Sequence, residues 1–316
     1  MPPGDDPDLD LRRVAIERVR ELAQRHDGLV PVGVLREGFA FAGTRVSYGS
    51  FYSGIFRPRQ MRGPAALAVV TTPPKDRRDA PYDDGFDQAT QTFTYHYRTA
   101  QQPTPQAAMA AEADNRALRA AHRLLVPLVY FHGIAPGQYT PLAPMFVVAD
   151  DPVARVVRMQ AALPVADLGA GGLVSDEPMR RYATREALVR LHQHRFRVDV
   201  LRAYARRCAV CSLREAALLQ AAHIIEDRDP HGGAAVVNGI ALCAIHHLAY
   251  DRNLMGIDPD GVVHIAHRLR EEQDGPMLKT GLQSFHGAGL LQPRRRDERP
   301  DPERLEVRFE RFRRAL

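Results

Sequence analysis

The chain has 316 residues, of which 45% are hydrophobic and 26% are charged, and its formal net charge is +5. These values are typical of a globular protein long enough for two modest domains. No run of about 18 apolar residues occurs, which excludes a membrane span. The acidic, Pro-rich start MPPGDDPDLDLRR lacks the pattern of a secretory signal. We therefore expect a cytoplasmic protein.

The positive charge comes from arginine, whose guanidinium group suits contact with phosphate. A mildly basic balance is compatible with nucleic-acid binding. Enrichment in arginine and alanine also follows from a GC-rich genome. The charge alone leaves both interpretations open.

Residue periodicity predicts the elements of the N-terminal half. Apolar residues recur at helical spacing over 9–25, and Gly28 ends that helix. The region 50–98 is predicted to be β-rich, with AALAVVTT as a buried strand and QTFTYHYR as a half-exposed one. A polar break at 101–106 precedes a helix over 107–125. Two further strands, LVPLVYFHGI and APMFVVAD, follow.

A change of composition divides the chain. The Gly-rich, acidic segment PVADLGAGGLVSDE is typical of a linker, and 179–206 is predicted to be a long basic helix, either a solvated face or a DNA contact. Near the C-terminus, Leu305, Phe309 and Phe312 form one helical stripe, which suits core packing or, more weakly, a dimer contact. The predicted parts are a helical lead-in over 1–48, a first domain over 49–163, a linker and basic helix over 164–206, and a second domain over 207–316.

The three cysteines all lie within one short stretch. Cys208 and Cys211 form a C-x2-C pair, and Cys243 and His246 form a C-x2-H pair. An odd number of cysteines argues against a disulfide framework, whereas two such pairs are the usual ligands of a tetrahedral structural Zn²⁺. The alternative is that these are ordinary buried cysteines.

A second polar set is nested between the zinc pairs. His223 lies in the apolar run AAHII, which is predicted to be a strand, and Asn238 follows a Gly-Gly loop. His247 and Asp251 are four residues apart on a predicted helix and therefore share one face. His246 is rotated by about 100° from His247 on that helix. The two histidines can therefore serve two different metals.

This segment resembles the HNH endonuclease family through its AHI, NG and HH-x3-D elements within a zinc frame. The resemblance implies that His223 is the general base and that Asn238 orients it. His247 and Asp251 would bind one catalytic Mg²⁺ or Mn²⁺. His247 would therefore be a catalytic residue as well as a metal ligand. Such a site would hydrolyse a phosphodiester bond.

Two positions depart from the family pattern. Ala222 stands where many HNH enzymes have Asp or His before the base, and Glu226 stands where many have Pro. The first change removes one metal ligand, and the second alters a turn or adds a carboxylate near the site. A zinc-held fold without catalytic activity is the alternative that these positions keep open.

Residues 50–150 are similar to the SRA (YDG) domain family, whose members bind modified cytosine. The resemblance is carried by GIFRPRQMRG, APYDDGFD, QTFTYHYR and DNRALRAAHRLLVPLVYFHGI. The Gly-rich turn usual after the F-T-Y strand is replaced by HYRTAQQ. SRA domains flip the modified base out of the duplex into an aromatic pocket.

The SRA resemblance implies roles for seven residues. Tyr82 and Tyr95 would stack on the flipped base, and Asp84 or its neighbour Asp83 would accept a hydrogen bond from cytosine N4. The arginines after the GI turn would contact DNA; these are Arg57, Arg59 and Arg62. The alternative is that Tyr82 is a core or turn residue and that the aspartates cap a loop.

Together the two resemblances predict an α+β fold: an N-terminal SRA-like (PUA-type) pseudo-β-barrel with flanking helices, and a C-terminal zinc-stapled ββα-metal HNH domain. This combination is similar to bacterial modification-dependent restriction endonucleases. The expected partner is double-stranded DNA carrying 5-methylcytosine or 5-hydroxymethylcytosine. One HNH site cuts one strand, so a homodimer is expected. A non-cutting reader and an HNH nuclease without modification dependence are the alternatives.

Overall fold

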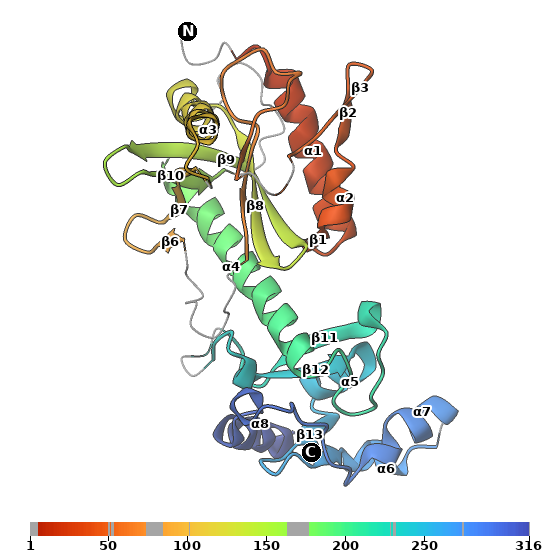
Figure 1. Ribbon diagram of the computed structural model, residues 1–316. Helices are drawn as coiled ribbons and strands as arrows, with labels where there is room; N and C mark the ends of the chain where they lie inside the picture. The colour runs from red at the N-terminus through yellow and green to blue at the C-terminus, as the bar shows by residue number, and fades with distance from the viewer. Residues whose placement is uncertain are drawn as a thin grey trace. The chain divides into compact units, whose positions relative to one another are not determined.

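The computed structural model describes residues 6–49, 51, 54–73, 85–100, 102–162, 177–227, 229, 232–273 and 275–315. The chain divides into two compact units, residues 1–194 and 195–316 (Figure 1). The division falls within helix α4 (Glu177–Ala203), inside the segment 164–206 expected to connect the domains. The other predicted boundaries stay predictions.

The N-terminal unit is built on a curled half-barrel sheet of eight strands, counted over the described residues, in the order β4-β5-β8-β9-β10-β7-β6, with β1 paired to β9. Only β5 and β8 are parallel; the other pairings of this sheet are antiparallel. β2 (Phe39–Phe41) and β3 (Thr44–Val46) form a separate hairpin. The sheet strands are β1 (Val30–Pro31), β4 (Ile55–Phe56), β5 (Ala68–Thr71), β6 (Phe86–Asp87), β7 (Thr92–His96), β8 (Leu128–Ala135), β9 (Gln138–Asp151) and β10 (Val156–Ala161).

Helix α1 (Leu9–Arg25) packs its apolar stripe on this sheet. Its Leu11 and Ile16 belong to the same buried cluster as Phe131 of β8. Burial of such side chains contributes about 1.5–3 kcal/mol each. The short helix α2 (Val32–Arg36) follows β1. The amphipathic pattern over 9–25 therefore predicted this helix correctly.

Helix α3 (Pro105–Leu124) begins where its sequence favours a start. The Thr104 hydroxyl accepts a hydrogen bond from the Ala107 amide at 3.2 Å, and Pro105 occupies the first turn. The buried Asn115 then binds the backbone of Arg98 on both sides, accepting from its N–H at 2.8 Å and donating to its carbonyl at 3.0 Å. These bonds fix α3 against the chain that follows β7.

The C-terminal unit contains the strand–strand–helix arrangement expected of the nuclease segment. β11 (Leu219–His223) pairs antiparallel with β12 (Gly239–Cys243), and α5 (Ala244–Asp251) follows directly. A second hairpin joins β13 (Met255–Ile257) to β14 (Val263–Ile265). The remaining elements are η1 (Ala216–Leu218), η2 (Val236–Asn238), α6 (His267–Glu271), α7 (Pro276–Gly281), η3 (Gln283–Phe285), η4 (Arg296–Glu298) and α8 (Pro302–Arg314).

Helix α8 packs against the second hairpin and against α5. Leu305 and Phe312 are buried, and a Cβ at Gly256 would lie 2.9 Å from Phe312 Cε1. The Arg308 guanidinium binds the Tyr250 carbonyl and the Asn253 side chain. The C-terminal stripe is therefore used in the core of its own unit, and Leu305 and Phe312 offer no dimer contact.

None of the described helices combines the length and the apolar character that crossing a membrane requires.

Candidate metal centres and active site

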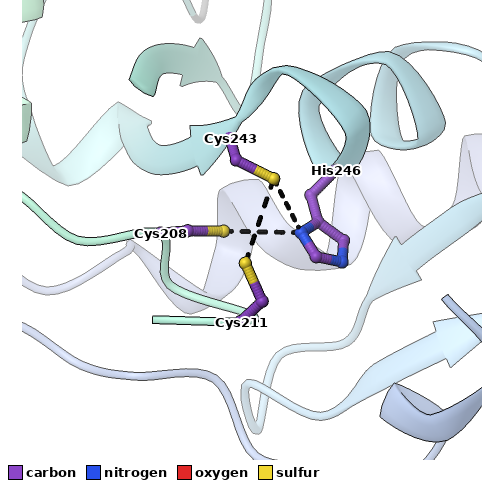
Figure 2. A group of neighbouring side chains, drawn as sticks. All are labelled: Cys208, Cys211, Cys243 and His246. Carbon is purple, nitrogen blue, oxygen red and sulfur yellow. Dashed lines mark hydrogen bonds between the residues drawn. The ribbon is translucent and has the colours of Figure 1, made fainter. Parts of the chain in front are cut away.

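The predicted zinc ligands lie together (Figure 2). Cys208 and Cys211 come from the turn after α4, Cys243 ends β12, and His246 lies in the first turn of α5. The ligand atoms of all four lie within 4.8 Å of one another. Cys211 Sγ is 3.9 Å from Cys243 Sγ, and His246 Nδ1 is 3.5 Å from Cys208 Sγ and 3.1 Å from Cys243 Sγ. Within the described part of the chain, no other group of three or more such ligands meets this criterion.

These distances and this chemistry fit Zn²⁺. Ligands at 2.0–2.3 Å from a tetrahedral ion are separated from each other by about 3.3–3.8 Å. A hydrogen bond with Cys208, together with burial, raises the pKa of Cys243 to about 11, and burial raises the pKa of Cys211. The hydrogen bond with Cys243 lowers the pKa of Cys208 instead. A bound Zn²⁺ would stabilise the thiolate form of all three cysteines. The Cys3His cluster therefore suggests a structural zinc site.

His223 lies at the end of β11, opposite Gly239 of β12. Its ring stacks on Phe196 of α4, with ring centroids 3.9 Å apart and an interplanar angle of 12°. Its Nε2 is buried and has no hydrogen-bond partner among the described residues. Burial lowers the pKa of His223, partly offset by Asp227, while His247 lowers it further. His223 is therefore held as a neutral imidazole near pH 7.

Asn238 holds the loop that follows His223. It is completely buried. Its side chain accepts from the Ile225 amide and donates to the Ile225 carbonyl, both at 2.9 Å, and also donates to the Gly233 carbonyl at 2.9 Å. The strand predicted over AAHII therefore ends at His223. Beyond it, the backbone N–H and carbonyl of Ile225 form hydrogen bonds with the Asn238 side chain and not with a neighbouring strand.

His247 and Asp251 lie on one face of α5, as their spacing predicts. His247 Nε2 is 3.4 Å from Asp251 Oδ2, and His247 Nδ1 is 2.5 Å from Gln220 Oε1. Neighbouring ligands of an octahedral Mg²⁺ at 2.0–2.1 Å are separated by about 3 Å. The two side chains therefore fit a divalent cation that takes its remaining ligands from water and phosphate.

The two positions that depart from the family pattern have different surroundings. Ala222 is completely buried in the core of the unit. Glu226 is exposed, and its carbonyl accepts from the Asp229 amide at 2.9 Å. A Cβ at Gly232 would overlap with the Glu226 carbonyl, so glycine permits this close approach of the two backbone segments.

Sequence reasoning missed three residues of this site. Phe196 contacts His223 from α4, Gln220 contacts His247 from β11, and Gly239 lets α4 approach, because a Cβ there would lie 2.9 Å from Phe196 Cε2. Of these three residues, Gly239 is the one that a local sequence pattern indicates, because it follows Asn238 in an Asn-Gly pair. The partners of Phe196 and Gln220 lie 27 positions away in the chain, at a distance that periodicity does not address.

In the N-terminal unit, Tyr82, Asp83 and Asp84 lie outside the described residues. Tyr95 is buried on β7, its hydroxyl donates to the Val70 carbonyl at 3.3 Å, and burial raises its pKa. Its ring meets Tyr130 of β8 edge to face at 6.5 Å. Tyr130 in turn bonds to His132 Nδ1 at 2.8 Å. Tyr95 thus belongs to a polar aromatic cluster on the sheet.

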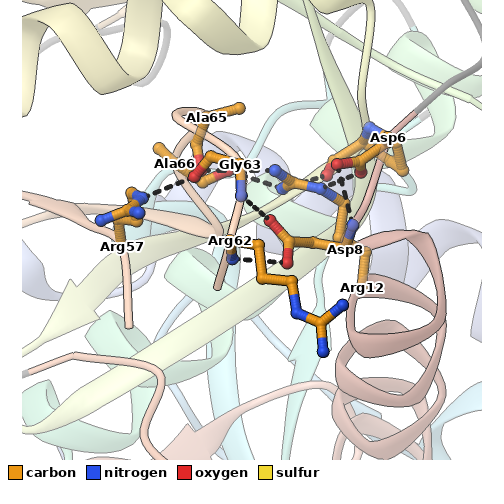
Figure 3. A network of polar contacts seen from close by, with 9 residues as sticks. Asp6, Asp8, Arg12, Arg57, Arg62, Gly63, Ala65 and Ala66 are labelled. Atoms are coloured by element: carbon orange, nitrogen blue, oxygen red, sulfur yellow. Dashed lines mark hydrogen bonds and ion pairs between the residues drawn. The ribbon is translucent and has the colours of Figure 1, made fainter. Parts of the chain in front are cut away.

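The predicted DNA-contacting arginines lie on a loop held by buried charges (Figure 3). Asp8 accepts from the amides of Arg62 and Gly63 at 2.8 and 2.7 Å. Two guanidinium nitrogens of Arg57 donate to carbonyls of the same loop, those of Gly63 and Met61. Arg57, Arg59 and Arg62 are all exposed, and the side chain of Arg62 extends away from the network. Arg57 therefore holds the loop together.

The guanidinium group of Arg12 lies at the centre of this network. It is completely buried, donates to the carbonyls of Ala65, Ala66 and Pro127 at 3.3, 2.6 and 3.0 Å, and pairs with Asp6 at 2.7 Å. A single side chain thus joins α1 to the loop before β5 and to the start of β8.

Residues 208–258 match the HNH endonuclease family. This part of the chain is an HNH endonuclease domain, and enzymes of this family are phosphodiester hydrolases. Among solved structures, the chain is similar to one described as a modification-dependent TagI restriction endonuclease, with 19% identity and a TM-score of 0.28 over 77% of this chain and 80% of that one. A comparison with curated proteins found no match.

Proposed function

We propose that the HNH domain cleaves double-stranded DNA, with His223 as general base, Asn238 as the residue that orients its loop, and His247 and Asp251 as ligands of Mg²⁺ or Mn²⁺. The observation that carries this proposal is the state of His223. Its Nε2 has no partner among the described residues, burial lowers its pKa, and both His247 and Asp251 act on it electrostatically. A catalytic base needs a free lone pair at neutral pH.

The surrounding side chains support these roles. The Phe196 stack limits rotation of the His223 ring, and the Asn238 bonds fix the chain directly after it. His223 can then take a proton from a water molecule that attacks the phosphate. A divalent cation bound by His247 and Asp251 would stabilise the negative charge that develops on the phosphate and the leaving oxygen. The Cys3His site would hold β12 and α5 in place.

We further propose that the N-terminal unit reads DNA carrying 5-methylcytosine or 5-hydroxymethylcytosine. The ordered sequence resemblance to SRA domains over 50–150 supports this, and a curled sheet with flanking helices is compatible with it. Tyr82, Asp83, Asp84 and Tyr95 would form the base pocket, and the exposed arginines Arg57, Arg59 and Arg62 would contact DNA. A flipped base could stack on Tyr95 after that side chain leaves Val70. A homodimer would supply a second site for the second strand.

Digestion of matched plasmids tests both proposals. Unmodified, 5-methylated and 5-hydroxymethylated DNA are incubated with the protein and Mg²⁺ or Mn²⁺. We expect cleavage of modified DNA only, and a loss of about 10²- to 10⁴-fold in rate for His223→Ala. The control is His267→Ala, which alters an exposed histidine paired with Glu271 in the same unit.

The results of this digestion test the proposed nuclease and the proposed reader of modified DNA independently. Equal cleavage of all three plasmids would overturn the reader and leave the nuclease. Binding of modified duplex without cleavage under any metal would overturn the nuclease and leave the reader. If the His223→Ala variant still cleaves DNA at the wild-type rate, His223 is not the general base.

A further inference from the structure

Gln220 contacts His247 through the ring nitrogen that does not face Asp251. Its Oε1 lies 2.5 Å from His247 Nδ1, whereas His247 Nε2 lies 3.4 Å from Asp251 Oδ2. One ring nitrogen thus faces a strand residue and the other faces a residue of its own helix. We propose that Gln220 is a positioning residue that keeps the His247 proton on Nδ1 and so presents Nε2 to the catalytic cation. This inference rests on the proposed role of His247 as a metal ligand.

The chemistry of the contact determines which nitrogen carries the proton. The Gln220 amide directs its oxygen toward Nδ1, and because an amide oxygen only accepts, Nδ1 donates in this arrangement. A neutral imidazole carries one N–H, which leaves a lone pair on Nε2. That lone pair and the Asp251 carboxylate then face each other as two acceptors. Such a pair is favourable when a cation lies between its members.

Without Gln220 the ring has another arrangement available. The proton can move to Nε2 and be donated to Asp251, which satisfies both side chains and removes Nε2 as a ligand. The ring can also turn about its Cβ–Cγ bond. The Gln220 contact opposes both changes, because it fixes the direction of Nδ1 from β11.

Gln220 lies where its replacement should affect the position of His247 without affecting the fold. Gln220 is exposed, and among the described residues the side chain of Gln220 forms a hydrogen bond with His247 alone. The core of the unit is formed by other residues of β11 and β12, among them Leu219, Ala222 and Ile240. Loss of the Gln220 amide should therefore change the metal site while leaving the fold and the zinc cluster intact.

Binding of Mn²⁺ to the zinc-loaded full chain tests the inference. The signal of free aqueous Mn²⁺ is followed by electron paramagnetic resonance for the wild type, Gln220→Leu, Gln220→Glu and His247→Ala. We expect Gln220→Leu to weaken Mn²⁺ binding by about 10- to 100-fold. Gln220→Glu retains an acceptor for Nδ1–H and should stay within a few-fold of the wild type. Gln273→Leu, at an exposed glutamine of the same unit, is the matched control.

Each outcome separates this inference from the proposed function. If His247→Ala binds Mn²⁺ like the wild type, the proposed catalytic site is wrong. If His247→Ala loses binding while Gln220→Leu keeps it, the site stands and the role of Gln220 is overturned.

A second measurement covers the case in which Gln220→Leu loses zinc or melts early. The ¹⁵N resonances of the His247 ring, assigned by comparison with His247→Ala, report the tautomer in zinc-loaded wild-type protein without Mn²⁺. We expect the Nδ1–H form. An Nε2–H form would overturn the inference.

Discussion

Two buried polar side chains, one in each unit, have opposite surroundings. In the N-terminal unit, the buried Arg12 guanidinium is bonded to Asp6 and to three backbone carbonyls. In the HNH unit, the buried Nε2 of His223 has no partner among the described residues. A satisfied buried charge holds elements together, whereas an unsatisfied buried base is ready to take a proton. The comparison separates Arg12, which holds the fold together, from His223, for which we propose a role in the reaction.

The two units also obtain their stability from different sources. The N-terminal unit has a long sheet and an apolar cluster that includes α1. The HNH hairpin has two strands of five residues each, beside the Cys3His cluster. The HNH unit also has an apolar core, and the ligands Cys208 and Cys243 are part of it, so a bound Zn²⁺ would join that core to the hairpin and to α5.

Zinc removal should have the largest effect. In Cys211→Ser, or after treatment with a strong chelator, we expect the HNH unit to lose its cooperative unfolding transition while the transition of the N-terminal unit remains. Structural Zn²⁺ sites in zinc-finger peptides contribute about 10–16 kcal/mol of apparent binding free energy. Differential scanning calorimetry with metal analysis would measure this. Loss of both transitions together would contradict independent stabilisation of the units.

Replacement of Arg12 should have the converse effect. Arg12→Met leaves Asp6 and the carbonyls of Ala65, Ala66 and Pro127 without their buried donor. We expect the free energy of unfolding of the N-terminal unit to fall by about 3–5 kcal/mol, the range found when one partner of a buried ion pair is removed. Chemical denaturation followed by circular dichroism would measure the loss.

The control for Arg12 is Arg13→Met on the same helix. Arg13 is exposed and pairs with Asp10 at the surface, where such pairs contribute about 0–1 kcal/mol. Equal losses in the two variants would contradict a special role for the buried guanidinium.

The features that the sequence predicted correctly are those that depend on neighbouring residues in the chain. The helix expected over 9–25 coincides with α1, and the helix expected over 107–125 lies within one or two residues of α3. The four zinc ligands also lie together as predicted. In each case the signal is local: a repeat of apolar residues, or cysteine and histidine at fixed short spacing.

Contacts between distant residues could not be read in this way. Arg12 occupies one position of an ordinary amphipathic helix, yet its carbonyl partners lie 53–115 positions later. The parallel pairing of β5 with β8 and the stack of Phe196 on His223 are of the same kind. Such contacts depend on the complete fold, and no local pattern in one sequence specifies them.

The pH dependence of cleavage should show the smallest effect. Burial lowers the pKa of His223 below its ordinary value of 6.5. The base acts when neutral, so cleavage should be retained above that lowered pKa and lost as the pH falls through it. In Phe196→Ala the ring becomes more hydrated, so its pKa should rise and the acid limb should move to higher pH. Phe309→Ala, at a half-buried phenylalanine of α8, should leave the limb unchanged. Rates of cleavage at saturating Mg²⁺ between about pH 5 and 8 would measure this shift, and a limb at the same pH in all three proteins would show that burial under Phe196 does not set the state of the base.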